Sequence, residues 1–140
     1  MATVIKKNVL SNIAQDLKTA TANTTLSTAA YAERVAKESM MGPKSGRMYK
    51  VSRTGKQHQA SAPGQAPAID TGNLVNSIRH QRVGQENART YTNTEYAAHL
   101  EFGTAKMAPR PFMTPAMMKS IDYMAKRSRL EINRIVAKYL

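Results

Sequence analysis

The sequence predicts an α+β fold in a single domain of 140 residues. Apolar residues recur at helical spacing near both ends, two short segments between residues 79 and 93 flank a polar four-residue loop, and a basic segment at residues 42–69 shows neither pattern. We expect an N-terminal helical region, a small antiparallel sheet with the basic segment as an extended arm or loop, and a long C-terminal helix packed on the sheet. A chain of this length suits one domain, 1–140, with a modest core.

The N-terminal region predicts two helical stretches separated by a weak point. The first covers about residues 3–19. Residues 19–28 are rich in Thr, Ala, Asn and Ser, which predicts a break or bend. The helical pattern then resumes over residues 26–38, and the Gly42-Pro43 pair ends it. The first stretch owes its amphipathic pattern to Val4, Ile5, Val9, Leu10, Ile13 and Leu17.

The basic segment, residues 42–69, contains four glycines, three prolines, five Lys or Arg residues and no acid. Residues 48–52 predict one strand of a loose hairpin with Thr54-Gly55 near the turn, and residues 57–67 predict an extended loop. A segment of this length usually serves an interface or a function. Three alternatives stay open: a solvated linker, an arm that clasps a neighbouring subunit, or a contact with DNA phosphates. The cations concerned are Lys44, Arg47, Lys50, Arg53 and Lys56.

The middle of the chain predicts a short helix followed by a hairpin. The helix begins at Asp70-Thr71-Gly72, with Asp70 or Thr71 as its N-cap, and ends near Ile78. Its inward face consists of Leu74, Val75 and Ile78. Residues 79–83 and 88–93 then predict two strands around a polar loop at residues 84–87.

Residues 94–116 predict a short helix, a tight turn, an extended linker and the start of a long helix. Glu95 begins the short helix after Thr94, and Gly103 ends it in a conformation with positive φ. The prolines at 109 and 111 keep the linker extended. Thr114-Pro115 predicts an N-cap and first helical position, so the last helix covers residues 115–139. Its expected inward stripe contains Met117, Ile121, Met124 or Ala125, Ile132, Ile135 and Val136.

Two separated blocks resemble the tail-completion, or head–tail joining, proteins of long-tailed bacteriophages. Residues 96–104 read Tyr-Ala-Ala-His-Leu-Glu-Phe-Gly-Thr, residues 106–113 read Lys-Met-Ala-Pro-Arg-Pro-Phe-Met, and Pro115-Ala116 follows. Upstream, residues 61–67 read Ser-Ala-Pro-Gly-Gln-Ala-Pro, residues 70–74 read Asp-Thr-Gly-Asn-Leu, and Ser77-Ile78 follows. The order and spacing of both blocks fit that family, and the resemblance extends loosely over most of the chain.

The resemblance implies a structural virion protein that forms a ring at the phage neck or tail end. Rings of that family are commonly six-membered. The ring would join the head connector to the tail tube and terminator proteins, with genomic DNA in its lumen. It would be located in the virion and made in the host cytoplasm. Two alternatives stay open for Phe102 and Phe112, which either anchor the joint or fill the subunit's own core. The interface residues we expect are Leu100, Phe102, Gly103, Thr104, Lys106, Arg110, Pro111 and Phe112.

Composition favours a binding function over catalysis. The net charge of +12 favours polyanionic neighbours, so a small basic nucleic-acid-binding protein is the alternative function. No cysteine is present, which excludes disulfides and thiolate metal sites. His58, His80 and His99 lack the spacing of metal ligands, and Glu95 and Glu101 are expected on a helix surface rather than in a catalytic pair. We expect no enzyme activity, no cofactor and no membrane-spanning segment.

Overall fold

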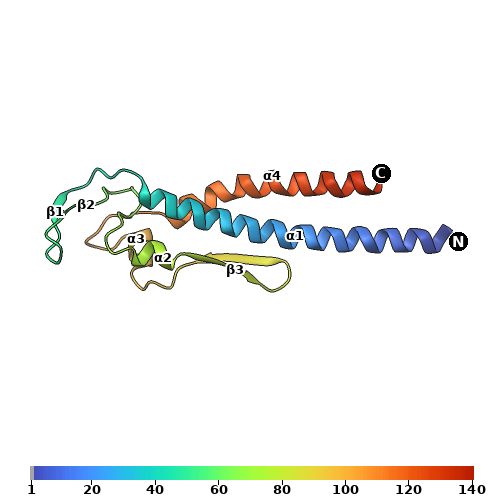
Figure 1. Cartoon of the computed structure of the whole chain (residues 1–140), viewed down its shortest axis with the longest axis horizontal. Helices are drawn as coiled ribbons and strands as arrows, with labels where there is room; N and C mark the ends of the chain where they lie inside the picture. Colours follow the sequence, from blue (N-terminus) through green and yellow to red (C-terminus); the bar gives the residue numbers. More distant parts are fainter. Residues whose placement is uncertain (1) are drawn as a thin grey trace.

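The computed structural model describes the backbone of residues 2–140 and the side chains of residues 8–140, so the side chains of Val4 and Ile5 lie outside the described part. The α+β fold class is confirmed, with a long helix at each end of the chain and two small antiparallel hairpins between them (Figure 1). The elements are α1 (Ala2–Met41), β1 (Met48–Lys50), β2 (Gln57–Gln59), α2 (Asn73–Ser77), β3 (Arg79–Val83), β4 (Asn87–Tyr91), α3 (Ala97–Phe102) and α4 (Met113–Tyr139).

Helix α1 is continuous, so the predicted break at residues 19–28 is wrong. The hydroxyl groups in this stretch donate to carbonyl oxygens three or four residues back, for example Thr21 to Leu17 at 2.9 Å and Thr28 to Thr24 at 2.7 Å. These bonds satisfy the side chains within the helix, where they could otherwise compete with its backbone bonds. Packing against neighbouring elements also stabilises the helix in this stretch, because Thr24 and Ala29 are buried. Tertiary contacts therefore override the weak helix propensity.

Helix α1 lies between α4 and the β3–β4 hairpin (Figure 1). We predicted that the C-terminal helix packs on the sheet, but its extensive contact is with α1. At the C-terminal end of α4, Lys138 and Tyr139 donate to the carboxylate of Asp16 on α1 at 2.7 and 2.9 Å. Across the other face of α1, the Thr90 hydroxyl donates to the Ala29 carbonyl at 2.8 Å. The β3–β4 sheet has two strands, and α1 packs against one of its faces.

Both hairpins are antiparallel. Strands β3 and β4 pair from Arg79 opposite Tyr91 to Val83 opposite Asn87, close to the predicted bounds. Strands β1 and β2 pair with Tyr49 opposite His58, which confirms the predicted hairpin in the basic segment. The loop predicted over residues 57–67 is wrong for residues 57–59, because these form β2. The basic segment therefore projects as a hairpin from the end of the molecule opposite both termini (Figure 1).

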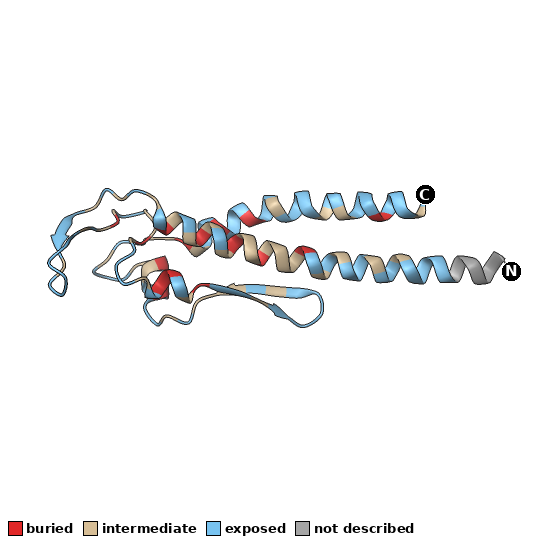
Figure 2. Cartoon of the chain, viewed as in Figure 1, coloured by how far each residue is buried: buried red, intermediate tan, exposed pale blue. Residues whose placement is uncertain are grey.

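The core is small and lies where the last turns of α1 meet α2, α3 and the start of α4 (Figure 2). Ile78 and Phe112 are its largest fully buried side chains. The predicted inward face of α2 is confirmed, but its N-cap position is taken by Gly72 at φ 84° and not by Asp70 or Thr71. The other members of the core are Ala36, Met40, Leu74, Val75, Ala97 and Ala116.

Gly103 ends α3 with φ 76° and ψ 178°, as the predicted turn requires. A Cβ here would lie 2.8 Å from the Met107 carbonyl oxygen and 2.9 Å from the Pro109 nitrogen. Backbone with this φ and ψ is essentially restricted to glycine. The turn therefore combines an unusual conformation with a close backbone approach.

We predict that Gly103→Ala lowers the free energy of unfolding more than Gly84→Ala does. Both glycines have φ 76°, but a Cβ at Gly84 meets nothing within 4 Å. The Gly84 variant should lose roughly 1–2 kcal/mol from backbone conformation alone, and the Gly103 variant should lose more because of the added clash. Urea unfolding of the two variants measures the difference. Equal losses would show that the backbone around Gly103 relaxes freely.

Candidate functional site

The carboxylate of Glu101 connects the end of α3 to the start of α4. It accepts hydrogen bonds from the backbone N–H groups of Phe112 at 2.8 Å, Met113 at 2.9 Å and Thr114 at 2.8 Å. These are among the N–H groups that a helix start leaves without partners. The prediction that Glu101 lies on a helix surface is wrong, because the residue is buried and caps α4, whose donors lie 11 to 13 residues further along the chain.

The protonation state of Glu101 follows from these bonds. Burial raises the pKa of its carboxyl, but the hydrogen bonds from Phe112, Thr114 and Met113 favour the carboxylate and hold the pKa below its usual value. The expected N-cap role of Thr114 is therefore not found, and Thr114 lies in the first turn of α4. Three backbone donors converge on one carboxylate, which fixes the direction in which α4 leaves the core.

The two sequence blocks that carry the phage resemblance meet in space. The Gly64 N–H donates to the Pro109 carbonyl at 2.9 Å, which joins the two proline-containing segments. Leu74 and Ile78 from the first block pack in one core with Ala97 and Phe112 from the second. Residues about 40 positions apart thus form one structural unit.

The same blocks form a cleft of about 320 Å³, which the β1–β2 hairpin bounds on one side. Its lining is partly apolar, with Leu74, Val75 and Leu100, and partly polar. Tyr49 and His58 contribute from the hairpin, with their rings edge to face at 5.2 Å between centroids. The remaining lining residues include Met40, Ala60, Ser61, Pro67, Ile69, Asp70, Thr71, Asn73, Tyr96 and Arg110.

Arg110 carries an unsatisfied donor in this cleft. Its backbone N–H donates to the Leu100 carbonyl at 2.7 Å, which fixes the linker against α3. Its side-chain Nε is buried and has no hydrogen-bond partner among the described residues. A buried donor without an acceptor costs free energy until an acceptor arrives. Arg110 therefore lines the cleft with part of its side chain while its Nε is closed off and unsatisfied.

The structure separates the two phenylalanines whose roles were left open. Phe112 is 1% exposed and fills the subunit's own core, whereas Phe102 is 75% exposed. Among the other expected interface residues, Leu100 packs against the core and Arg110 lines the cleft. Thr104 and Lys106 are exposed in the turn after Gly103, and Pro111 is half-buried in the linker. The set does not share one surface.

Helix α4 presents an exposed apolar face, which we define by Met117, Ile121, Met124, Ile132 and Val136. Each of these side chains is 40% to 60% exposed, so the prediction that this stripe is inward is wrong except for the neighbouring Ile135. The reason is that Ala116, Ser120 and Ile135 face α1, and the apolar stripe of α4 is wider than this contact. A groove between α1 and α4, lined by Leu17, Thr21, Met124 and Ile132 among others, continues the face.

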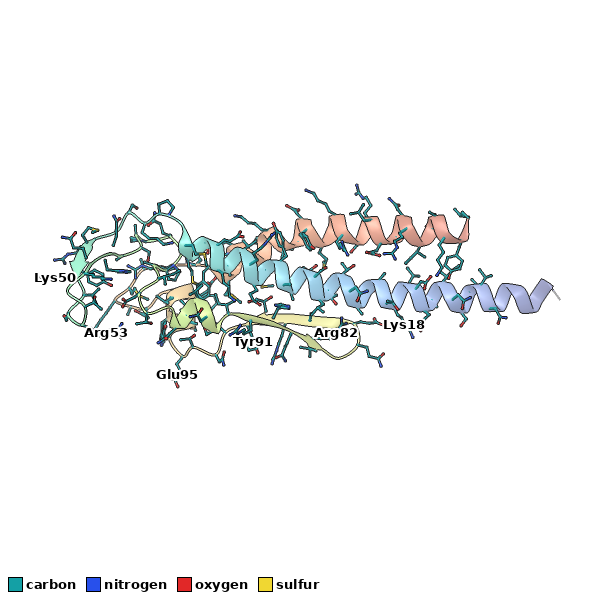
Figure 3. The ribbon with its side chains drawn as sticks, viewed as in Figure 1. Lys18, Lys50, Arg53, Arg82, Tyr91 and Glu95 are labelled. Atoms are coloured by element: carbon teal, nitrogen blue, oxygen red, sulfur yellow. The ribbon has the colours of Figure 1, made fainter. Side chains whose placement is uncertain are left out.

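The cations of the arm mostly lack partners among the side chains that the structure describes. Lys44 donates to the Ser39 carbonyl at 2.9 Å, and burial lowers the pKa of its amine. Arg47, Lys50, Arg53 and Lys56 are exposed. Figure 3 shows Lys50 and Arg53 near the tip of the hairpin. The arm is therefore a projecting cationic element.

Other kinds of site are not found in the described residues. No group of three or more His, Cys, Asp or Glu side chains there could hold a metal ion. His80 lies 2.5 Å from the Glu33 carboxylate through Nδ1, in a contact between β3 and α1. No described helix is long and apolar enough to cross a membrane. No protein-family model, curated protein or solved structure matches the chain.

We predict that Glu101→Gln lowers the free energy of unfolding at neutral pH by about 1–2 kcal/mol, because a neutral amide caps α4 less well than a carboxylate. Glu95→Gln is the control, since Glu95 is exposed and points away from the body of the molecule (Figure 3). It should change stability by less than about 0.5 kcal/mol. Thermal or urea unfolding of both variants gives the comparison.

The difference between wild type and Glu101→Gln should depend on pH. The folded-state pKa of Glu101 is depressed, so the charged cap contributes fully above the unfolded value of 4.5 and is lost as pH falls through the folded-state pKa. The two stability curves should therefore converge in acid. A constant difference from neutral pH to below the folded-state pKa would contradict the capping role of the charge.

Proposed function

We propose that this protein is a structural virion component that assembles into a ring at a phage neck or tail end and joins the head connector to the tail. The proposal rests first on the two sequence blocks that resemble tail-completion proteins. Those blocks form the Glu101 cap and contribute much of the core and the cleft, so they account for one coherent part of the fold. The function is binding and assembly, without catalysis.

The apolar face of α4 is the observation that carries the assembly role. Monomeric proteins rarely expose contiguous apolar surface of this kind, and such faces usually mark protein contacts. The isolated chain exposes 9860 Å² at a mass of 15.4 kDa. A compact monomer of that mass exposes roughly 7,200 Å². Roughly 2,700 Å² of extra surface is available, and a standard interface covers about 800 Å² of each partner.

In a ring, the partner that covers the α4 face is another copy of the same chain. In a ring, each subunit contacts two neighbours through two different surfaces, and rotation closes the chain of contacts. The elongated subunit suits this arrangement, because α1 and α4 project together from one end of the core and the basic arm projects from the other (Figure 1). We assign the α4 face to contacts with copies of this chain, and six copies are expected from the resemblance.

The exposed arm cations favour a second candidate function, a small basic nucleic-acid-binding protein. Four exposed cations lie on one hairpin segment that contains no acid. Contacts of this kind with phosphates give salt-sensitive binding without sequence preference. In a ring, the same cations are available to face genomic DNA in the lumen, so their exposure alone does not decide between the two functions, whereas their contribution to binding of free duplex DNA does.

We predict that the purified chain forms a discrete ring on tail tubes or tailless heads, and that Ile121→Ser combined with Ile132→Ser weakens this assembly. Each isoleucine removed from an interface costs roughly 1.5–3 kcal/mol, so association should weaken by at least about tenfold. Stability of the monomer should change little because both side chains are largely exposed. The mass in solution and the joining of particles are the measurements.

Leu130→Ser is the matched control for the α4 face. Leu130 is 64% exposed but lies on another side of α4, about 160° around the helix from Ile132. This variant should assemble as wild type does. Equal loss in the control and the double variant would show that the face has no special role. A chain that stays monomeric and ignores the particles would contradict the proposed function.

We predict that the arm cations contribute little to binding of free duplex DNA. Lys50→Glu combined with Arg53→Glu is compared with Lys119→Glu combined with Arg129→Glu on α4, and all four positions are exposed. The proposed function expects the same small effect from both pairs. A plot of log affinity against log salt has a negative slope. If the arm pair alone makes this slope shallower by about 1.8, the result would favour the nucleic-acid-binding function.

A further inference from the structure

Phe102 and the cleft lie on different sides of α3. Phe102 is the most exposed aromatic side chain in the described part of the chain. Leu100 and Tyr96 line the cleft, and they are four residues apart on one face of the helix. Phe102 is two positions beyond Leu100, which places it about 200° around the helix. The side chain therefore points away from the cleft of its own subunit.

The cleft has the chemistry to receive an aromatic ring. Leu74 and Val75 provide an apolar wall, and Tyr49 and His58 provide an aromatic wall from the arm. Arg110 brings its side chain, which ends in a guanidinium, to the lining of the cleft. The face of an aromatic ring attracts a guanidinium, most strongly where water is excluded.

We propose that Phe102 of one copy inserts into the cleft of the next copy, beside Arg110 and under the β1–β2 hairpin. This inference rests on the proposed ring assembly and names one of its joints. The inserted side chain and the receiving cleft are different surfaces of one subunit, so the contact is head to tail and generates a ring or a filament. The arm then touches the neighbouring subunit through Tyr49 and His58, while its cations near the tip stay free.

The available surface is sufficient for this joint. Two contacts of standard size, one through Phe102 and one through the cleft, cover about 1,600 Å² of each subunit. The extra exposed surface of the chain, roughly 2,700 Å² by the size relation for compact monomers, exceeds this. Aromatic and Arg residues are also the types that carry most of the binding energy at protein interfaces. The remaining surface includes part of the α4 face, which then serves further contacts in the ring.

Cross-linking between copies tests the joint directly, since the chain has no cysteine of its own. One variant carries Ala98→Cys, which lies four residues before Phe102 on the same face of α3. The other carries Thr71→Cys at the exposed edge of the cleft. When the two variants are mixed on tail tubes or tailless heads under mild oxidation, the mixed disulfide should form several-fold faster than either same-variant disulfide. Ala137→Cys on α4, mixed with Thr71→Cys, is the control and should show no such preference.

A third variant tests the ring of Phe102 itself. Phe102→Ala added to Ala98→Cys should remove the preference for the mixed disulfide, although the cysteines are unchanged. A mixed disulfide that forms no faster than the others, or a preference that survives Phe102→Ala, would overturn the inference. Joining of particles by the wild-type chain is measured separately. If the wild-type chain joins particles and the cross-link shows no preference, this joint is wrong and the assembly function stands.

Discussion

The fold depends on the three backbone donors that converge on the Glu101 carboxylate. Because the N–H of Phe112 is one of them, the cap also fixes the position at which Phe112 enters the core. The same bonds hold the start of α4 against the end of α3, and the direction of α4 then decides which of its side chains face α1. A tight turn at Gly103 and an extended linker are required for the carboxylate to reach these donors. The backbone conformations of the glycine and the prolines in this segment therefore make one long-range contact possible.

Local features of the sequence predicted much of this architecture. Helical spacing identified α1 and α4, the polar loop at residues 84–87 between two short segments identified the β3–β4 hairpin, and the prolines at 109 and 111 predicted the extended linker. Those patterns act within a few residues, where sterics and propensity decide. Glu101 was assigned to a surface because its partners are 11 to 13 residues away and are backbone groups. No side-chain pattern in the sequence marks such a bond.

The same limit explains the errors in helix packing and in the candidate site. The Thr-rich stretch of α1 has weak propensity, but packing on both sides keeps it helical. The stripe on α4 was predicted to be inward because its spacing is helical, and spacing does not show whether a partner in the same chain covers it. Phe102 and Phe112 lie ten residues apart in similar surroundings, so only the geometry of the cap separates the surface residue from the core residue. Arg110 was expected at the joint, but its unsatisfied Nε could not be foreseen.

The position of the cleft couples assembly to stability. Leu100 lines the cleft, packs against the core and accepts the backbone bond from Arg110. A group that fills the cleft thus contacts residues that hold the small core together. A partner that binds only the folded chain stabilises it by mass action. Under the proposed function, each subunit would gain stability from its neighbour directly beside its own small core. A modest core and a large exposed surface are therefore consistent features of a chain whose final state is an assembly.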